Sequence, residues 1–325
     1  MRYLVTGATG KVGHAVACRL LDRGEGVVAL VRDVAAARSI LPAGIELAAG
    51  DVTQPETIHR AAEGIDGVFN CMGIYEQWLR DDSMFEQVNA QGALNVITAA
   101  RQAGAKRAVH TSTFDVFHAD RGGTLNETRL ADYPKGTAYE RSKQHAEELV
   151  LAEAEQGIEV VIVNPTAVYG PGPWAAAGLD SVVRDVIRRR LPAVPPGGLS
   201  LAYVDDVADG HIAAFEKARP GERYILGDGF ATNDSIARAA VEEAGRGWVP
   251  PTIPVNVARA LSAAGDRIAS VIRRPPLLPG GQLHFLLWEA RIDNAKAREE
   301  LGVTFRGWEE GIRATVRWMQ EEDLV

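Results

Sequence analysis

The sequence predicts an α/β protein built on a doubly wound parallel sheet. A short apolar run, Tyr3–Val5, leads directly into three glycines, Gly7, Gly10 and Gly13. Apolar residues then recur at helical spacing as far as Leu21, so a helix begins within the glycine series. Further short apolar runs alternate with helical patterns through the first half of the chain. This alternation is typical of parallel strands joined by crossover helices.

The glycine series has the form of a phosphate-binding turn. The pattern T-G-x-x-G-x-x-G directs free backbone N–H groups and the positive end of the helix dipole toward an anion. Glycine also allows close approach of the backbone to a pyrophosphate. An ordinary strand–turn–helix connection is the alternative. We expect a dinucleotide to be bound by Gly7, Thr9, Gly10, Lys11, Val12 and Gly13.

The later strands define the proposed domain organisation. They are expected at Gly26–Val31, Ile45–Ala49, Asp66–Asn70, Arg107–Thr111, Glu159–Val163 and Ser200–Val204. We assign residues 1–164 to a dinucleotide-binding domain and 165–325 mostly to a substrate-binding region. Residues 200–218 and nearby segments are expected to return to the main sheet, with Asp205 capping a helix that runs to Phe215.

The residues that follow the second and fourth strands bear on the cofactor. An acidic residue after the second strand would bind the ribose 2′-OH of NAD, whereas an arginine can hold the 2′-phosphate of NADP. Arg32 occupies this place, so we expect NADP(H) rather than NAD(H). The alternative is a surface arginine paired with Asp33. After the fourth strand, Cys71, Met72 and Gly73 would let the cofactor ribose approach the backbone.

A tyrosine–lysine pair is the candidate for acid–base chemistry. Thr137 and Glu140 form a capping-box pattern that begins a helix. Tyr139 and Lys143 are four residues apart on that helix, so they lie on one face, and no other tyrosine of the chain has this spacing to a lysine. A nearby ammonium favours the phenolate, which makes tyrosine a usable base near neutral pH. Tyr139 could then exchange a proton with an alcohol or carbonyl oxygen.

The order of these motifs resembles the extended short-chain dehydrogenase/reductase superfamily. The matching segments are TGATGKVG, GDV, an N-x-x-G at Asn89, TST, YERSK, NPTAVYGPG and YVDDVADG. The resemblance implies a Rossmann-type fold in which Thr113 hydrogen-bonds the substrate oxygen and Tyr139 is the acid or base. It further implies that Lys143 orients the nicotinamide ribose and that Asn89 supports the active site.

The same resemblance implies further cofactor contacts and an assembly. Asp51 and Val52 would lie along the adenine, the alternative being that Asp51 only starts a turn, and Pro165 and Val168 would pass the nicotinamide. A long helix is predicted over Met84–Ala103. In the superfamily this helix and the one that carries the catalytic tyrosine often pair into the four-helix bundle of a homodimer.

The substrate is expected to be a small molecule other than a nucleotide sugar. Dehydratases of that class carry two acids after the catalytic threonine, but here Phe114 replaces the first and only Asp115 remains. Epimerases grip the substrate diphosphate with an arginine near residues 197–201, and no basic residue stands there. Trp78 either lines the substrate site or is an aromatic side chain packed on the protein surface. The substrate candidates are Trp78, Phe114, Asp115, Tyr169 and Trp174.

The apolar segment Pro250–Trp288 has three interpretations. We expect most of its apolar residues to form core and a minority to line a pocket for a hydrophobic substrate. A role at a membrane surface is the least supported.

Composition excludes several other classes. With 325 residues, of which 46% are hydrophobic, the chain can bury a large core, and its net charge of −8 argues against nucleic acid as partner. The seven histidines lack metal-binding spacing, so no metal is expected. The two cysteines form no disulfide framework, which favours the cytoplasm. Neither a signal peptide nor a membrane-spanning run is seen, so stable membrane insertion is not expected.

The leading functional hypothesis is an NADP(H)-dependent oxidoreductase that interconverts a fairly apolar ketone or aldehyde and its alcohol. Within the superfamily, the chain looks closest to dihydroflavonol-reductase-like, 3β-hydroxysteroid-dehydrogenase-like and hopanoid-associated sugar epimerase proteins. A sugar epimerase with no net redox change would use the same residues. A non-catalytic NAD(P)-sensing protein is less favoured, because such proteins usually lack the tyrosine–lysine pair that Tyr139 and Lys143 form.

Overall fold

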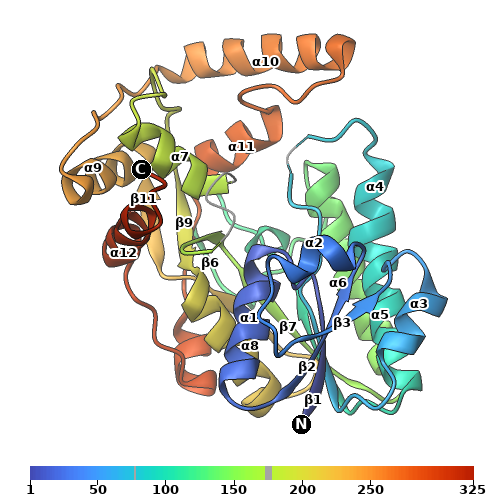
Figure 1. The fold of residues 1–325 in the computed structure, drawn as a ribbon. Coiled ribbons are helices and arrows are strands. Elements are labelled where there is room, and N and C mark those ends of the chain that lie inside the picture. Colours follow the sequence, from blue (N-terminus) through green and yellow to red (C-terminus); the bar gives the residue numbers. More distant parts are fainter. Residues whose placement is uncertain (77, 173–177) are drawn as a thin grey trace.

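The computed structural model, which describes residues 1–76, 78–172 and 178–325, has a central sheet of seven parallel strands (Figure 1). Their order is β10-β7-β5-β4-β1-β2-β3. The strands are β1 (Arg2–Thr6), β2 (Gly26–Val31), β3 (Glu46–Ala49), β4 (Gly67–Asn70), β5 (Arg107–Thr111), β7 (Glu159–Pro165) and β10 (Arg223–Leu226). The predicted doubly wound α/β fold is confirmed.

Helices cover both faces of this sheet, which explains why its strands are apolar on both sides. The helices α1 (Lys11–Asp22) and α8 (Val204–Lys217) pack on one face. The other face is covered by α3 (Pro55–Ala61), α5 (Gly92–Gln102) and α6 (Ala138–Ala154). The short α2 (Val34–Arg38) connects β2 to β3.

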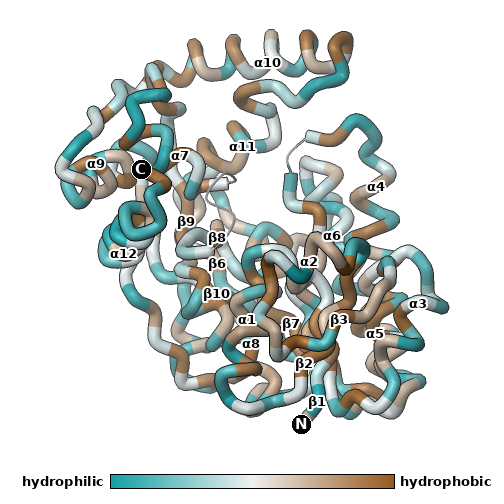
Figure 2. Tube along the Cα trace, in the orientation of Figure 1, coloured by the Kyte–Doolittle hydropathy of each residue, from teal (hydrophilic) through white to brown (hydrophobic). Residues whose placement is uncertain are grey.

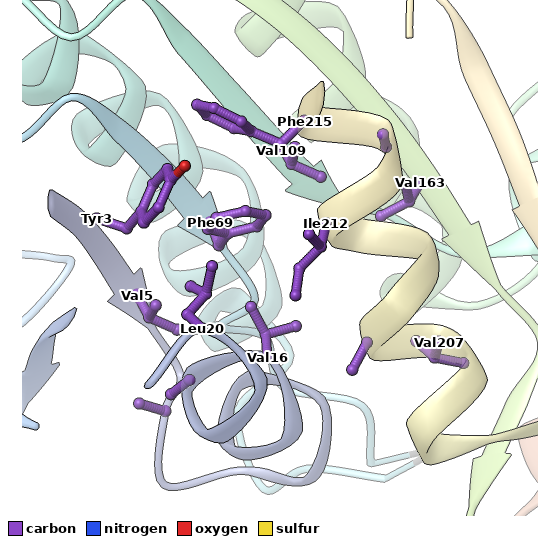
Figure 3. Packing of buried hydrophobic residues seen from close by; sticks show 14 of the residues in the cluster. Tyr3, Val5, Val16, Leu20, Phe69, Val109, Val163, Val207, Ile212 and Phe215 are labelled. Carbon is purple, nitrogen blue, oxygen red and sulfur yellow. The ribbon is translucent and has the colours of Figure 1, made fainter. Parts of the chain in front are cut away.

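Aromatic packing fixes α8 against the sheet (Figure 3). The Tyr3 ring lies edge-on to the rings of Phe69 and Phe215, with centroid distances of 5.4 and 5.1 Å. A Cβ atom at Gly67 would come within 2.3 Å of the Phe215 ring, so only glycine fits there. This contact joins α8, which lies late in the chain, to β1, the first strand of the sheet.

The strand order reverses between β1 and β4, and this position defines the cofactor crevice. From β1 the chain runs outward through β2 and β3 and then crosses to β4 on the other side of β1. The register sets Thr6 opposite both Leu30 and Asn70, so the carboxyl ends of these strands are level. In open α/β sheets, ligands bind outside the carboxyl ends at such a reversal.

A smaller region carries a second sheet, in the order β11-β9-β8. Its strands are β8 (Ala167–Tyr169), β9 (Gly198–Tyr203) and β11 (Gly229–Thr232), and it packs with α7 (Gly178–Ile187), α9 (Asn233–Ala244) and α12 (Trp308–Glu321). Residues 200–218 and nearby segments were expected to return to the main sheet. The strand β9 does not, because it pairs with β8 and β11 instead, whereas α8 packs on the main sheet. The nearby strand β10 forms one edge of the main sheet, and β3 forms the other.

The remaining elements connect the two regions. A two-stranded sheet joins β6 (Thr124–Leu125) to β12 (Arg291–Ile292), and a π-helical turn, η3 (Ala297–Leu301), precedes α12. Two helices, α10 (Val255–Ile272) and α11 (Gly280–Trp288), follow α9, and α10 lies on the outside of the molecule (Figure 1). None of the helices in the described ranges is long and apolar enough to cross a membrane.

Local helix signals are mostly confirmed. The predicted helix over Met84–Ala103 is formed by α4 (Ser83–Phe85), a π-helical stretch η1 (Glu86–Gln91) and α5. The capping box of Thr137 and Glu140 is present at the start of α6. Asp205 does not cap α8, because Tyr203 holds the N-cap position and Asp205 lies in the first turn.

The expectation that most of Pro250–Trp288 forms core is wrong. Leu283, Phe285 and Leu286 of α11 are buried, but the large apolar side chains of α10 are exposed. The reason is that the buried positions of α10 are occupied by small residues, Ala258 and Ala269 among them.

Candidate active site

The glycine turn after β1 is packed so closely that it admits only glycine at two positions. Gly7 has φ +67°, and a Cβ atom there would lie 2.7 Å from Met72 Cα. A Cβ atom at Gly13 would lie 2.3 Å from the Gly7 carbonyl oxygen. Gly10 holds the N-cap position of α1, and no described side chain caps the helix there. The first N–H groups of α1 therefore remain available for an anion.

Thr113 and Tyr139 are brought together at the carboxyl end of β5. Thr113 follows that strand and caps the short 3-10 helix η2 (Phe114–Val116), whereas Tyr139 lies in the first turn of α6. Their side chains are hydrogen-bonded. Lys143, one turn further along α6, is buried and donates to the Thr111 carbonyl oxygen at 2.9 Å. Three of the four predicted catalytic residues thus share one place.

Asn89, the fourth, is a positioning residue in this structure. It is fully buried within η1, and its Oδ1 accepts from the Ile74 amide at 2.7 Å. Its Nδ2 donates to the Ile74 carbonyl oxygen and to Ser142 Oγ, each at 3.0 Å. Ser142 in turn donates to the Tyr139 carbonyl oxygen at 2.7 Å. Asn89 therefore ties the segment after β4 to the first turn of α6, and the π-helical stretch supplies its placement.

The pKa of Tyr139 shifts opposite to the direction that the tyrosine–lysine spacing predicts. Burial raises it above its ordinary value, and the charges of Asp115 and Glu140 add to the rise. The hydrogen bond with Thr113 opposes them. Burial likewise lowers the pKa of Lys143 to about 8, against the attraction of Glu147. Desolvation is thus the dominant electrostatic influence on both groups.

Asp115 contacts Thr113. Its Oδ2 accepts from Thr113 Oγ1 at 2.7 Å, and its side chain is buried. Burial and the neighbouring Glu140 raise the pKa of Asp115 to about 7, while Thr113 and Lys135 oppose the rise. The Thr113 hydroxyl has a single proton, which it gives to Asp115 in this structure, so a substrate oxygen would have to replace Asp115 as the acceptor of that proton. Asp115 therefore orients Thr113.

A further hydrogen-bond network supports the backbone of Thr113. Asn164 Nδ2 donates to the Thr113 carbonyl oxygen at 3.0 Å and to Glu147 Oε1 at 2.8 Å. Glu147 also pairs with Arg223 of β10. Sequence reasoning missed these residues, although Glu147 continues the spacing of Tyr139 and Lys143 along one face of α6. That spacing is a signal that could have found it.

The strand ends carry the expected cofactor residues. Arg32 is exposed after β2, and Asp33 caps α2 by accepting from the Ala36 amide at 3.0 Å. Within the described ranges, no ion pair joins Arg32 to Asp33. Asp51 accepts from the backbone amide and hydroxyl of Thr53 at 2.9 and 2.8 Å, and so it stabilises the turn after β3.

Several other expected cofactor residues are placed as follows. Val52 contacts Gly92 of α5, where a Cβ atom would lie 2.8 Å from Val52 Cγ2. Lys11 forms a salt bridge with Asp180 and donates to the Gly170 carbonyl oxygen at 2.9 Å, so its ammonium is held by the protein. Cys71, Met72 and Gly73 follow β4, Pro165 ends β7, and Val168 is half-buried in β8.

The substrate candidates separate into different environments. Phe114 stacks on Trp288 with a centroid distance of 6.1 Å, and Trp78 is half-buried. Tyr169 is not at a substrate surface, because it is 1% exposed and its hydroxyl donates to the Trp308 carbonyl oxygen at 3.2 Å. Trp174 lies outside the described residues.

These residues fit a nicotinamide dinucleotide. The backbone at Gly73 lies close to the Lys143 ammonium, since a Cβ atom there would lie only 3.2 Å from Lys143 Nζ. The free N–H groups of α1 and the exposed Arg32 suit phosphates. The described residues contain no cluster of His, Cys, Asp or Glu that could hold a metal ion.

Comparison with known proteins identifies the family. The model of the NAD dependent epimerase/dehydratase family matches residues 3–227. The chain belongs to this family. A putative dihydroflavonol 4-reductase of Synechocystis sp. is 28% identical, over 99% of this chain and 96% of that protein. Sterol demethylase protein B of Methylococcus capsulatus is 30% identical over the full length of both chains.

Solved structures agree with the fold. The crystal structure of gox2253 has a TM-score of 0.84 and 27% identity, and the match covers 100% of this chain and 99% of that one. Membership of this family and the reductase names among the relatives identify the chain as an NAD(P)-dependent enzyme of the oxidoreductase type, acting on CH–OH groups.

Proposed function

We propose that this family member is an NADP(H)-dependent reductase that interconverts a fairly apolar ketone or aldehyde and its alcohol. The observation that carries the proposal is the hydrogen-bonded pair of Thr113 and Tyr139 next to the buried Lys143 at the carboxyl end of β5. Two hydroxyls at one place can both address a single substrate oxygen.

The residues divide the work as follows. A bound nicotinamide supplies or accepts the hydride. Thr113 and Tyr139 hold the substrate oxygen, and Tyr139 gives its proton to that oxygen in reduction and takes it back in oxidation. Lys143 would bind the nicotinamide ribose, and the hydrogen bond with Thr113 opposes the effect of burial on the pKa of the Tyr139 phenol. Asp115 and Asn89 keep these groups in place.

Arg32 supports NADP(H) as the cofactor. The side chain is exposed at the end of β2, and the nearby carboxylate of Asp33 is used as the cap of α2. An arginine that is not neutralised by a neighbour can hold a 2′-phosphate in a bidentate manner.

The surroundings of Phe114 support an apolar substrate. Trp288 stacks on Phe114 and also borders a cavity of about 490 Å³, together with Leu283 and Leu287. The segment 197–201 offers no cation for a diphosphate. The name of the relative from Methylococcus capsulatus, a sterol demethylase protein, is in line with an apolar substrate of this kind.

The test follows NADPH oxidation by the purified protein against a panel of apolar aldehydes and ketones. Tyr139→Phe should lower turnover by about 10²–10⁴-fold and leave NADPH binding unchanged. Tyr133→Phe is the matched control, because Tyr133 is 44% exposed and its hydroxyl bonds only to His118 among the described residues. If NADPH binds and no substrate is reduced, while a sugar is epimerised without net redox change, the reductase proposal is wrong.

A further inference from the structure

Helix α10 carries a stripe of large apolar side chains that no described part of the protein covers. Leu261, Ile268 and Val271 are 58%, 57% and 81% exposed, and Leu277 in the following loop is fully exposed. Figure 2 shows the apolar colouring along this outlying helix. We call the following set the α10 stripe: Val257, Leu261, Ile268, Val271, Ile272 and Leu277.

The spacing of these residues places the α10 stripe on one face of the helix. Positions 257, 261, 268, 271 and 272 recur at intervals that fall on one side of an α-helix. A different side, with the small residues Ala258, Ser262 and Ala269, is the buried one. The loop that holds Leu277 is fixed to α10, since the Gly280 amide donates to Asp266 at 3.2 Å. Helix and loop therefore present one surface.

The charge around the stripe is opposite to that of the whole chain. Residues 255–278 contain four arginines (Arg259, Arg267, Arg273 and Arg274) and one acid, Asp266, which gives a net charge of +3. The full chain carries −8. In the described part of the protein, no salt bridge involves any of the four guanidinium groups. A basic and apolar surface on an acidic protein is complementary to a surface that is both anionic and hydrophobic.

We propose that α10 and the loop to Leu278 dock on the surface of an anionic lipid bilayer. Amphipathic helices with arginines on the polar side lie in the plane of the interface and bury their apolar face in it. Anionic headgroups attract such basic segments. A second copy of this chain is a poorer occupant, because a symmetric contact would bring the same arginines together.

The side of α10 away from the stripe borders a cavity near Phe114. The cavity of about 490 Å³ is bordered by Ser262 of α10 and by Leu283 and Trp288 of α11. Trp288 stacks on Phe114, the residue after Thr113. The helix that would dock on the bilayer therefore also borders the cavity that we propose for an apolar substrate. This last step rests on the proposed function, whereas the docking itself does not.

The experiment measures co-sedimentation of the full chain with vesicles, without cofactor or substrate, so that its outcome is independent of the enzyme assay. One set of vesicles holds equal parts of phosphatidylcholine and phosphatidylglycerol, and the other holds phosphatidylcholine alone. We expect at least about tenfold tighter binding to the mixed vesicles. Absence of binding to the mixed vesicles would overturn the proposal.

Two variants locate the surface. The triple variant Leu261→Ser, Ile268→Ser, Val271→Ser should lose binding by at least about tenfold. The double variant Arg273→Glu, Arg274→Glu should remove the preference for the mixed vesicles. Thermal melting verifies that each variant is folded, and since all five residues are exposed we expect no change in it.

Matched controls are available on other surfaces. Leu130→Ser changes an apolar residue that is 43% exposed, and Arg188→Glu with Arg190→Glu changes another exposed arginine pair. Both controls should bind as the unmodified chain does. If the stripe variants bind like the controls, α10 is not the docking face. If instead they abolish self-association in sedimentation velocity without changing vesicle binding, a second copy covers the stripe and the proposal is wrong.

Discussion

Glu147 of α6 and Arg223 of β10 form an ion pair of 2.6 Å, and Glu147 is linked through Asn164 to the backbone of Thr113. The carboxylate is 4% exposed and the guanidinium 19%. The other oxygen of Glu147 accepts from Asn164, which also donates to the Thr113 carbonyl oxygen. Glu147 in addition raises the pKa of Lys143 against the effect of burial. One side chain thus affects both the position of Thr113 and the charge of Lys143.

Glu147→Gln should therefore lower both stability and activity. Arg223 would lose its counter-charge in a largely buried place, which costs about 2–4 kcal/mol in the free energy of unfolding measured by urea denaturation. The pKa of Lys143, about 8 in the unmodified chain, should fall further. The alkaline limb of the profile of kcat/KM against pH should then move to lower pH.

Glu148→Gln is the matched control, because Glu148 is the exposed neighbour on the same helix. It should change the free energy of unfolding by less than about 0.5 kcal/mol. If Glu147→Gln lowers the free energy of unfolding but leaves the profile of kcat/KM against pH unchanged, the role of Glu147 is structural only.

Asp115→Asn should remove a pH dependence of stability. Burial raises the pKa of Asp115 from 3.8 to about 7, so between these values the native state holds a proton that the unfolded chain has released. The stability of the unmodified protein therefore decreases as pH rises through this window, by at most about 4 kcal/mol, and the contribution is constant above it. Urea unfolding at a series of pH values should show the unmodified chain losing stability relative to the variant.

The control for this series is Asp120→Asn, which changes an exposed carboxylate near the same segment. Its difference from the unmodified chain should not depend on pH between about 4 and 7. A difference for Asp115→Asn that is equally flat would show that Asp115 is ionised throughout, and its assignment as a raised carboxyl would be abandoned.

Local patterns predicted much of the fold because they are short-range. Apolar runs such as that of Gly26–Val31 and the capping box of Thr137 and Glu140 depend on neighbours within a few residues. Gly7 and Gly13 were identified from the glycine spacing, and the structure gives the reason, since a Cβ atom at either position would collide with backbone.

What could not be predicted depends on contacts between distant segments. Glu147 and Arg223 are 76 residues apart, and no local pattern pairs them. The strand β9 has the composition of a core strand, yet pairs outside the main sheet. Likewise, the apolar residues of α10 were expected in the core, because hydrophobicity alone does not say which surface covers a residue.

Arg32→Ala should change cofactor preference without changing the chemistry. Loss of charge-assisted hydrogen bonds to a 2′-phosphate costs about 1.5–3 kcal/mol, so the KM for NADPH should rise by about tenfold or more. The KM for NADH should stay the same, because NADH has no phosphate there. Steady-state kinetics with both cofactors measure the change.

Arg38→Ala supplies the comparison for Arg32, since Arg38 is an exposed arginine in the last turn of α2. It should leave both KM values within about twofold, as expected for a surface substitution. If Arg32→Ala raises the KM values for NADPH and NADH equally, or raises neither, Arg32 does not bind the 2′-phosphate. The preference for NADP(H) then has no support from this side chain.

Gly73→Ala tests whether the close approach of Gly73 to Lys143 is needed for activity. The added Cβ would lie 3.2 Å from Lys143 Nζ and 3.4 Å from Asn89 Oδ1, and the flexible ammonium is the group that can move aside. The fold should survive, with Tm changed by less than about 2 °C, whereas kcat/KM should fall by about 10–100-fold because a displaced Lys143 ammonium would no longer hold the cofactor in its reacting geometry. Gly229→Ala is the control, since its Cβ would make only an ordinary 3.5 Å contact with Trp308. If Gly73→Ala is as active as Gly229→Ala, the position of the Lys143 ammonium beside Gly73 is not needed for catalysis.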